Sequence, residues 1–335
     1  MEAGLKFVIP AKAGIQLLQG GKRKKRDPRF RGDDGGGGMA EFEIVAEGLR
    51  FPEGPVAMPD GSVILVEIEA GRVARVRPDG GKEIVAEPGN GPNGLALGPD
   101  GKLYCVNNGG FSWIESEGSL RPHLTAADYE GGRVDRIDIA SGAVETLYRS
   151  GDHGITLRGP NDIVFDAHGG FYFTDFGKTR ARDRDTTGLF YGKADGSFIA
   201  EVVHPMDAPN GIGLSPDGKT VYAAETFSTR LWAFPVEAPG RLGPARHLYR
   251  PAGFTWFDSL AVEENGNICV ATLGEGGISV VSPDGVLIEF VPTPDFFTTN
   301  IAFGGADMRT AWITLSESGR LAKMEWPRPG LRLAY

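Results

Sequence analysis

The chain has 335 residues, of which 41% are hydrophobic and 24% charged, a globular composition that excludes wholesale disorder. The formal net charge of -9 argues against nucleic-acid or anionic-membrane partners, and no stretch approaches 18 uncharged apolar residues, so none is expected to span a membrane. The 50 glycines have no collagen period and predict many tight turns between short strands.

The first 38 residues differ from the rest in charge, with a net of +5 against -14 for residues 39–335. Pro10 and Lys12 interrupt the only apolar stretch and no small-residue cleavage site follows it, so the segment is a poor fit to a signal peptide. The strings VIPAKAGIQ and DPRFRGDD are typical of translated repeat elements at mis-called starts of bacterial genes. We therefore expect a disordered leader over residues 1–38 and a folded protein that begins at Met39.

An internal repeat then runs through the chain. Residues 42–61 align without a gap on residues 82–101, and the second half of this unit returns at 159–175, 208–225, 256–272 and 298–314. Each copy is a short apolar run, a turn that contains glycine, and a second strand. A further pair of strands is predicted at 71–87, 132–148, 188–203 and 276–291.

Four antiparallel strands in each of six units predict an all-β fold, a six-bladed β-propeller formed by residues 39–335 as one domain. The last copy supplies three strands, and the segment 42–47 is expected to add the fourth and close the ring. The cysteines, Cys105 and Cys269, then fall in opposite blades, which excludes a disulfide between them. Free thiols suit a cytoplasmic location.

The connections divide between two faces of the predicted ring. The PDG and ADG turns are short hairpins and are expected to be structural only. The two long loops, 111–132 and 175–188, fall on the opposite face, where the first strand of each unit begins. Two long loops over one mouth predict a partial lid above a pocket.

One polar residue opens the first strand of every unit, and these side chains are expected to converge at the top of the central channel. They are Glu53, Asn93, Asn161, Asn210, Asp258 and, with an approximate alignment, Asn300. A single Asn between Pro and Gly is commonly a turn residue, but six carboxylate or amide oxygens around one axis need shared partners. A site made of oxygen donors, with no Cys or His in register, favours Ca²⁺ or Mg²⁺. The carboxylates of Glu53 and Asp258 would balance the charge of the dication.

The motif order, from FPEGP through GPNDIVFD to FDSLAV, resembles the family of senescence marker protein, gluconolactonase and luciferin-regenerating enzyme over residues 41–332. The resemblance implies a propeller with one divalent ion, Ca²⁺ first and Mg²⁺, Mn²⁺ or Zn²⁺ as alternatives. It implies metal ligands at Glu53, Asn161, Asn210 and Asp258. Asn93 and Arg158 are the expected substrate contacts.

The resemblance further implies a metal-dependent hydrolase of a small lactone, in which Asp258 is a ligand and either general base or nucleophile. Cleavage of a phosphoester or organophosphate at the same site is one alternative, and a non-catalytic binding propeller stabilised by metal is another. A Ser–His–Asp triad through Ser259 lacks a histidine at a recognisable spacing. The expected partner is a small molecule, and the expected state is a monomer or weak homo-oligomer.

Overall fold

The computed structural model describes residues 42–335, and the expected leader, residues 1–38, lies outside them. The described chain is built from antiparallel strands with one short 3-10 helix, Asp152–Gly154. Within residues 42–335, no helix is long and apolar enough to cross a membrane. The all-β fold predicted from the repeats is confirmed.

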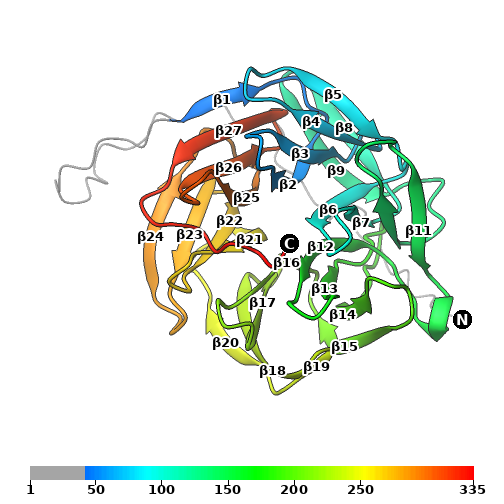
Figure 1. Ribbon diagram of the computed structural model, residues 1–335. Helices are drawn as coiled ribbons and strands as arrows, with labels where there is room; N and C mark the ends of the chain where they lie inside the picture. Colours follow the sequence, from blue (N-terminus) through cyan, green and yellow to red (C-terminus); the bar gives the residue numbers. More distant parts are fainter. Residues whose placement is uncertain (1–41) are drawn as a thin grey trace, which may run out of the picture. The chain divides into compact units, whose positions relative to one another are not determined.

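Six sheets of four or five strands surround a central axis (Figure 1). We call β2, β6, β12, β16, β21 and β25 the inner strands, because each begins its sheet at the axis and contacts the inner strands of both neighbouring sheets. Their bounds are Pro52–Ala57, Pro92–Leu97, Pro160–Phe165, Pro209–Leu214, Trp256–Val262 and Thr298–Gly304. The arrangement is a six-bladed β-propeller.

The other strands follow outward in each blade. Blade one continues with β3 (Val63–Glu67), β4 (Arg72–Val76) and β5 (Lys82–Ala86), and blade two with β7 (Leu103–Asn107), β10 (Arg133–Ile137) and β11 (Val144–Arg149). Blade three has β13 (Gly170–Asp175), β14 (Thr187–Lys193) and β15 (Ile199–Met206). Blade four has β17 (Thr220–Glu225), β18 (Arg230–Ala238), the short β19 (Arg241–Leu242) and β20 (Arg246–Tyr249).

Blade five adds β22 (Ile268–Leu273), β23 (Gly277–Val281) and β24 (Leu287–Pro292). Blade six has only β26 (Thr310–Leu315) and β27 (Arg320–Glu325) after its inner strand. Its fourth strand is β1 (Glu43–Ala46), which pairs antiparallel with β27. The outermost strand of the last blade therefore comes from the start of the described chain.

The core lies between adjacent blades. One cluster joins Tyr104 and Val106 of blade two to Phe171 and Phe173 of blade three, and similar clusters fill the other interfaces. Because the second strand of a blade is covered on both faces, its residues are continuously apolar rather than alternating, as in the fully buried β3. Cys105 and Cys269 are buried and free, as predicted.

The hairpin turns have the predicted chemistry. The glycines of the PDG and ADG turns (Gly61, Gly80, Gly101, Gly196, Gly218 and Gly285) all adopt positive φ, from 67° to 87°. These turns join the first to the second strand or the third to the fourth, and so mark the lower face of the ring. The upper face is the one at which the inner strands begin.

The long connection of blade two is more ordered than the sequence predicted. Residues expected to form a loop fold into a hairpin of β8 (Phe111–Ser116) and β9 (Ser119–Thr125). Neither strand alternates between buried and exposed residues, so no period-2 pattern distinguished them from a loop in the sequence. We call this element the upper hairpin.

The end of the chain returns to the axis, where Figure 1 shows it at the centre of the ring. The Leu331 N–H donates to the Val262 carbonyl at 2.8 Å, and the Tyr335 ring meets Phe165 edge-on at 5.7 Å between centroids. Together with the inner strands, this segment lines a cavity of about 620 Å³ in the lower channel. The sequence contained no signal for this placement.

Candidate functional site

The six polar residues predicted at the channel top are called the ring residues: Glu53, Asn93, Asn161, Asn210, Asp258 and Asn300. At or next to each of them, the pairing of the inner strand with its neighbour shifts register. Such bulges re-aim side chains and bend the strand. A bulge at the same place therefore redirects one polar side chain in every blade.

Close backbone packing holds neighbouring ring residues in one layer. A Cβ built on Gly54, which has φ +53°, would lie 2.6 Å from the carbonyl oxygen of Asn93 in the next blade. A Cβ on Gly211 would lie 2.7 Å from the carbonyl oxygen of Asp258. Glycine at these positions is required because any side chain would separate adjacent inner strands.

A second set of buried polar residues fixes the approach to the ring residues of blades one to four, and sequence reasoning missed it. The side chain that ends the second strand accepts backbone N–H groups of the segment before the inner strand. Glu67 accepts from Arg50 at 2.8 Å, Asn107 from Gly91 at 3.1 Å, Asp175 from Gly159 at 2.7 Å and Glu225 from Asp207 at 2.8 Å. In the sequence, this set is visible as the recurring polar residue that ends the second strand of a unit, in LVE, CVN, FTD and AAE.

A hydrogen bond joins two ring residues from different blades at the axis. The Asn300 Nδ2 donates to Glu53 Oε2 at 2.8 Å, and the Gly54 N–H donates to the same oxygen at 2.9 Å. The neighbouring Asn210 side chain lowers in part the pKa of Asp258, which burial raises, and the Asn210 Nδ2 donates to Thr226 Oγ1 at 3.1 Å. The Asn210 Oδ1, in contrast, is buried and accepts no hydrogen bond.

The carboxylates of this site repel one another. Burial, offset in part by the Asn300 hydrogen bond, raises the pKa of Glu53. Burial, together with the negative charge of Glu53, raises the pKa of Asp258 well above its ordinary value. Both effects also raise the pKa of Asp162, the residue after Asn161, to about 7. No cationic side chain contributes to the pKa shift of any of these three carboxyl groups. Together they form an electrostatically unfavourable cluster.

A bound divalent cation would relieve this cluster, and the residues present fit one. The unpartnered Asn210 Oδ1 is the neutral oxygen that a hard cation would take, and Glu53 and Asp258 supply the charge. Among residues 42–335, no three His, Cys, Asp or Glu side chains are grouped so that they could hold a metal ion by themselves. The predicted ligand set depends on amide oxygens for that reason, and it stays a prediction.

The same electrostatics predict how stability responds to pH in metal-free protein. Raised carboxylate pKa values mean that the native state holds protons that the unfolded state has released. The free energy of unfolding should therefore fall as pH rises from about 4 to about 7, by about 1–4 kcal/mol. Urea unfolding at several pH values in chelator measures the slope, and Ca²⁺ added at pH 7 should restore the loss.

The matched variant for this measurement is Asp162→Asn, which should flatten the slope because it removes one of the raised carboxyl groups. Asp60→Asn is the control, since this carboxyl is exposed and its pKa is lowered by its hydrogen bonds to Ser62. Stability that increases with pH over this interval would contradict the electrostatic reading of the site.

Asp162 and Ser259 occupy the position after the ring residue in blades three and five, where blades one, two and four have glycine. Asp162 accepts the N–H groups of Ile163 at 2.9 Å and Ile212 at 3.2 Å. Ser259 is buried and lies near Asp162, whose pKa it lowers in part.

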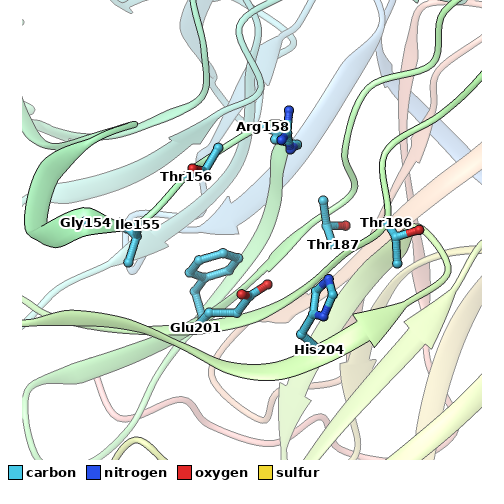
Figure 2. Close-up of a pocket in the computed structure, with 9 residues that line it drawn as sticks. Gly154, Ile155, Thr156, Arg158, Thr186, Thr187, Glu201 and His204 are labelled. Carbon is cyan, nitrogen blue, oxygen red and sulfur yellow. The ribbon is translucent and has the colours of Figure 1, made fainter.

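The predicted substrate contacts are separated. Asn93 is buried in the ring layer beside Gly54. Arg158 lines a different pocket of about 320 Å³ on blade three, into which Glu201 and His204 of β15 extend (Figure 2). None of the ring residues lines this pocket, and the Arg158 guanidinium lies 3.6 Å from Asp185.

Two long upper connections are fastened together by the buried Lys178. Its Nζ donates to Asn108 Oδ1 at 3.1 Å and to the Gly110 carbonyl at 2.8 Å, and it lies 4.1 Å from the centroid of the Phe111 ring. Burial lowers the pKa of Lys178 to about 7. The lysine therefore anchors the base of the upper hairpin to the loop of blade three.

The upper hairpin then crosses blade one to reach blade six. Trp113 packs against Phe51 of blade one at 5.3 Å between ring centroids. Farther along, the Leu120 N–H donates to the Glu317 carbonyl at 3.0 Å, in the connection between β26 and β27. The hairpin is therefore a fixed partial cover on one side of the upper face.

Six closed blades with carboxylate and amide oxygens gathered at the axis define a class, the six-bladed propellers with an axial polar site. The sequence model of the SMP-30/Gluconolactonase/LRE-like region matches residues 51–317. The chain therefore belongs to this family, as the motif order suggested.

Individual relatives agree with this assignment. Gluconolactonase of Zymomonas mobilis is 25% identical over 296 residues, covering 78% of this chain and 76% of the relative. Lactonase drp35 of Staphylococcus aureus is 29% identical over 263 residues, covering 76% and 72%. Regucalcin of Agrobacterium tumefaciens, described as a calcium-binding protein, has the same fold with a TM-score of 0.69 and 20% identity over 88% of this chain and 98% of its own.

Proposed function

We propose that this protein is a divalent-metal-dependent hydrolase of a small lactone. The observation that carries the proposal is the buried, unpartnered Asn210 Oδ1 beside carboxylates whose pKa values are raised. The relatives named gluconolactonase and lactonase support a lactone as the substrate. The relative described as calcium-binding supports Ca²⁺ as the first ion to test.

Glu53, Asn161, Asn210 and Asp258 would hold the cation. When bound, such a cation supplies a Lewis acid that polarises a carbonyl and stabilises the oxyanion. Asn300 fixes the Glu53 carboxylate, and Thr226 fixes the Asn210 amide so that its oxygen stays free. These contacts preorganise the site before substrate arrives.

Asp258 is the residue proposed to accept the proton of the attacking water. It is the one ring residue that is only half-buried, whereas Glu53, Asn93, Asn161, Asn210 and Asn300 are buried. A carboxylate at this position could accept a proton from a water molecule beside bound substrate. Asp258 could instead attack the carbonyl carbon as a nucleophile from the same position. In either role, Asp258→Asn should lower kcat even at saturating calcium.

The proposal is tested with full-length protein stripped by chelator and assayed on a panel of lactones with Ca²⁺, Mg²⁺, Mn²⁺ or Zn²⁺ added back. We expect turnover to disappear with the metal and return first with Ca²⁺. Asn210→Leu should weaken calcium binding at least about tenfold, because it removes one oxygen ligand. Thr226→Val is the matched control, since it removes only the partner of the Asn210 Nδ2.

Lactone turnover that survives complete metal removal would contradict the mechanism. Calcium that raises thermal stability without turnover of any lactone would support a metal-stabilised binding propeller instead. Phosphotriesters assayed beside the lactones would reveal the organophosphatase alternative.

A further inference from the structure

The upper mouth of the channel is covered on one side only. The upper hairpin runs from blade two over blade one to blade six, and its contacts with Phe51 and Glu317 fix it there. No comparable hairpin follows the second strand of blade four or five within the described chain, where β17 and β22 lead to the next strand through short turns. The accessible side of the mouth therefore lies over Asn210 and Asp258.

Aromatic side chains stand on the blade-four edge of this open side. Phe227 is 39% exposed and directly follows Thr226, whose hydroxyl holds the Asn210 amide. The Phe227 ring packs against Phe176 at 5.6 Å, and the Arg184 guanidinium lies 4.4 Å above it. Arg184 is in turn paired with Asp207, so the orientation of the Phe227 ring is fixed.

A second aromatic pair stands on the blade-five edge. Phe254 is 80% exposed, and its ring meets Trp256 edge-on at 4.9 Å between centroids. Trp256 precedes Asp258 by two residues at the start of β21. Single exposed apolar residues are common on protein surfaces, but Phe254 and Trp256 lie four and two residues before Asp258, the one ring residue that is only half-buried.

We infer that Phe227, Phe254 and Trp256 form an apolar rim that selects the substrate, and that the lactone carries an alkyl or aryl substituent on its ring. This inference rests on the proposed function. An apolar substituent would pack against the aromatic faces once its reacting carbonyl reaches Asp258. A polyhydroxylated ring would instead place hydroxyl groups against these faces, where they lose their hydrogen bonds to water.

The test compares two lactones of equal ring size, one with an alkyl or aryl substituent and one with hydroxyl groups. The parent should prefer the apolar lactone. Phe254→Ala should lower kcat/KM for that lactone about tenfold, mainly through KM, while the unsubstituted lactone changes less than about twofold. Phe254→Leu should recover most of the loss because it keeps an apolar side chain.

Phe198→Ala is the matched control, since Phe198 is 43% exposed but lies in the turn between β14 and β15 on the lower face. A parent that prefers the hydroxylated lactone would overturn the inference. An equal loss with both lactones in Phe254→Ala would also overturn it.

A binding measurement keeps the inference testable if the parent hydrolyses no lactone and the proposed function fails. A non-hydrolysable lactam with the same apolar substituent is titrated while tryptophan fluorescence is recorded, with Trp256→Phe identifying the signal of Trp256. About tenfold weaker binding to Phe254→Ala supports the rim. Unchanged binding, or none to the parent, overturns it.

Discussion

Asp258→Asn is expected to abolish most turnover, lowering kcat by about 10²–10⁴-fold even at saturating calcium. The substitution keeps the size of the side chain and one oxygen donor, but it removes a negative charge and the capacity to accept a proton. Calcium affinity should fall as well, because Glu53 would be the remaining carboxylate among the proposed ligands. Calorimetric titration with calcium, paired with kcat at each plateau, separates the loss of affinity from the loss of chemistry.

Two variants serve as controls for Asp258. Asp162→Asn removes a neighbouring carboxylate that accepts the N–H groups of Ile163 and Ile212, so it reports how the loss of a nearby negative charge affects the site. Asn210→Asp adds a charge and should tighten the ion while weakening its Lewis acidity. An Asp258→Asn variant that binds calcium and turns over substrate like the parent would remove Asp258 from the chemistry and leave it a ligand at most.

Removal of β1 should cost most of the stability of the domain. A chain that starts at residue 48 lacks the strand that pairs with β27 and loses the contacts of Ile44, Val45 and Ala46 with blades six and one. Each apolar side chain lost is worth about 1–3 kcal/mol, against a total of about 5–15 kcal/mol for a typical domain. The exposed edge of β27 would also invite aggregation.

A chain that starts at Met39 is the matched control for this deletion, because it keeps β1 whole. Soluble yield and thermal unfolding of the two chains measure the difference. A chain without β1 that unfolds at the same temperature as the control would show that the pairing of β1 with β27 contributes little.

The sequence by itself determined the blades and the identity of the ring residues. Each blade is made of hairpins whose partners are close in sequence, so PDG turns and apolar runs are enough to predict them. The ring residues recur in register because every blade repeats the same local bulge beside its inner strand. The last repeat contains only three strands, and this predicted that residues 42–47 supply the fourth strand of blade six.

Only the tertiary structure decided how these residues interact. Glu53 and Asn300 are separated by 247 residues, and their hydrogen bond exists only because the ring is closed. The unpartnered Asn210 oxygen, the separate pocket of Arg158 and the path of the upper hairpin likewise depend on packing between blades. Local pattern fixes which residues a strand presents, whereas their partners, burial and pKa values are set by segments that the chain brings together from a distance.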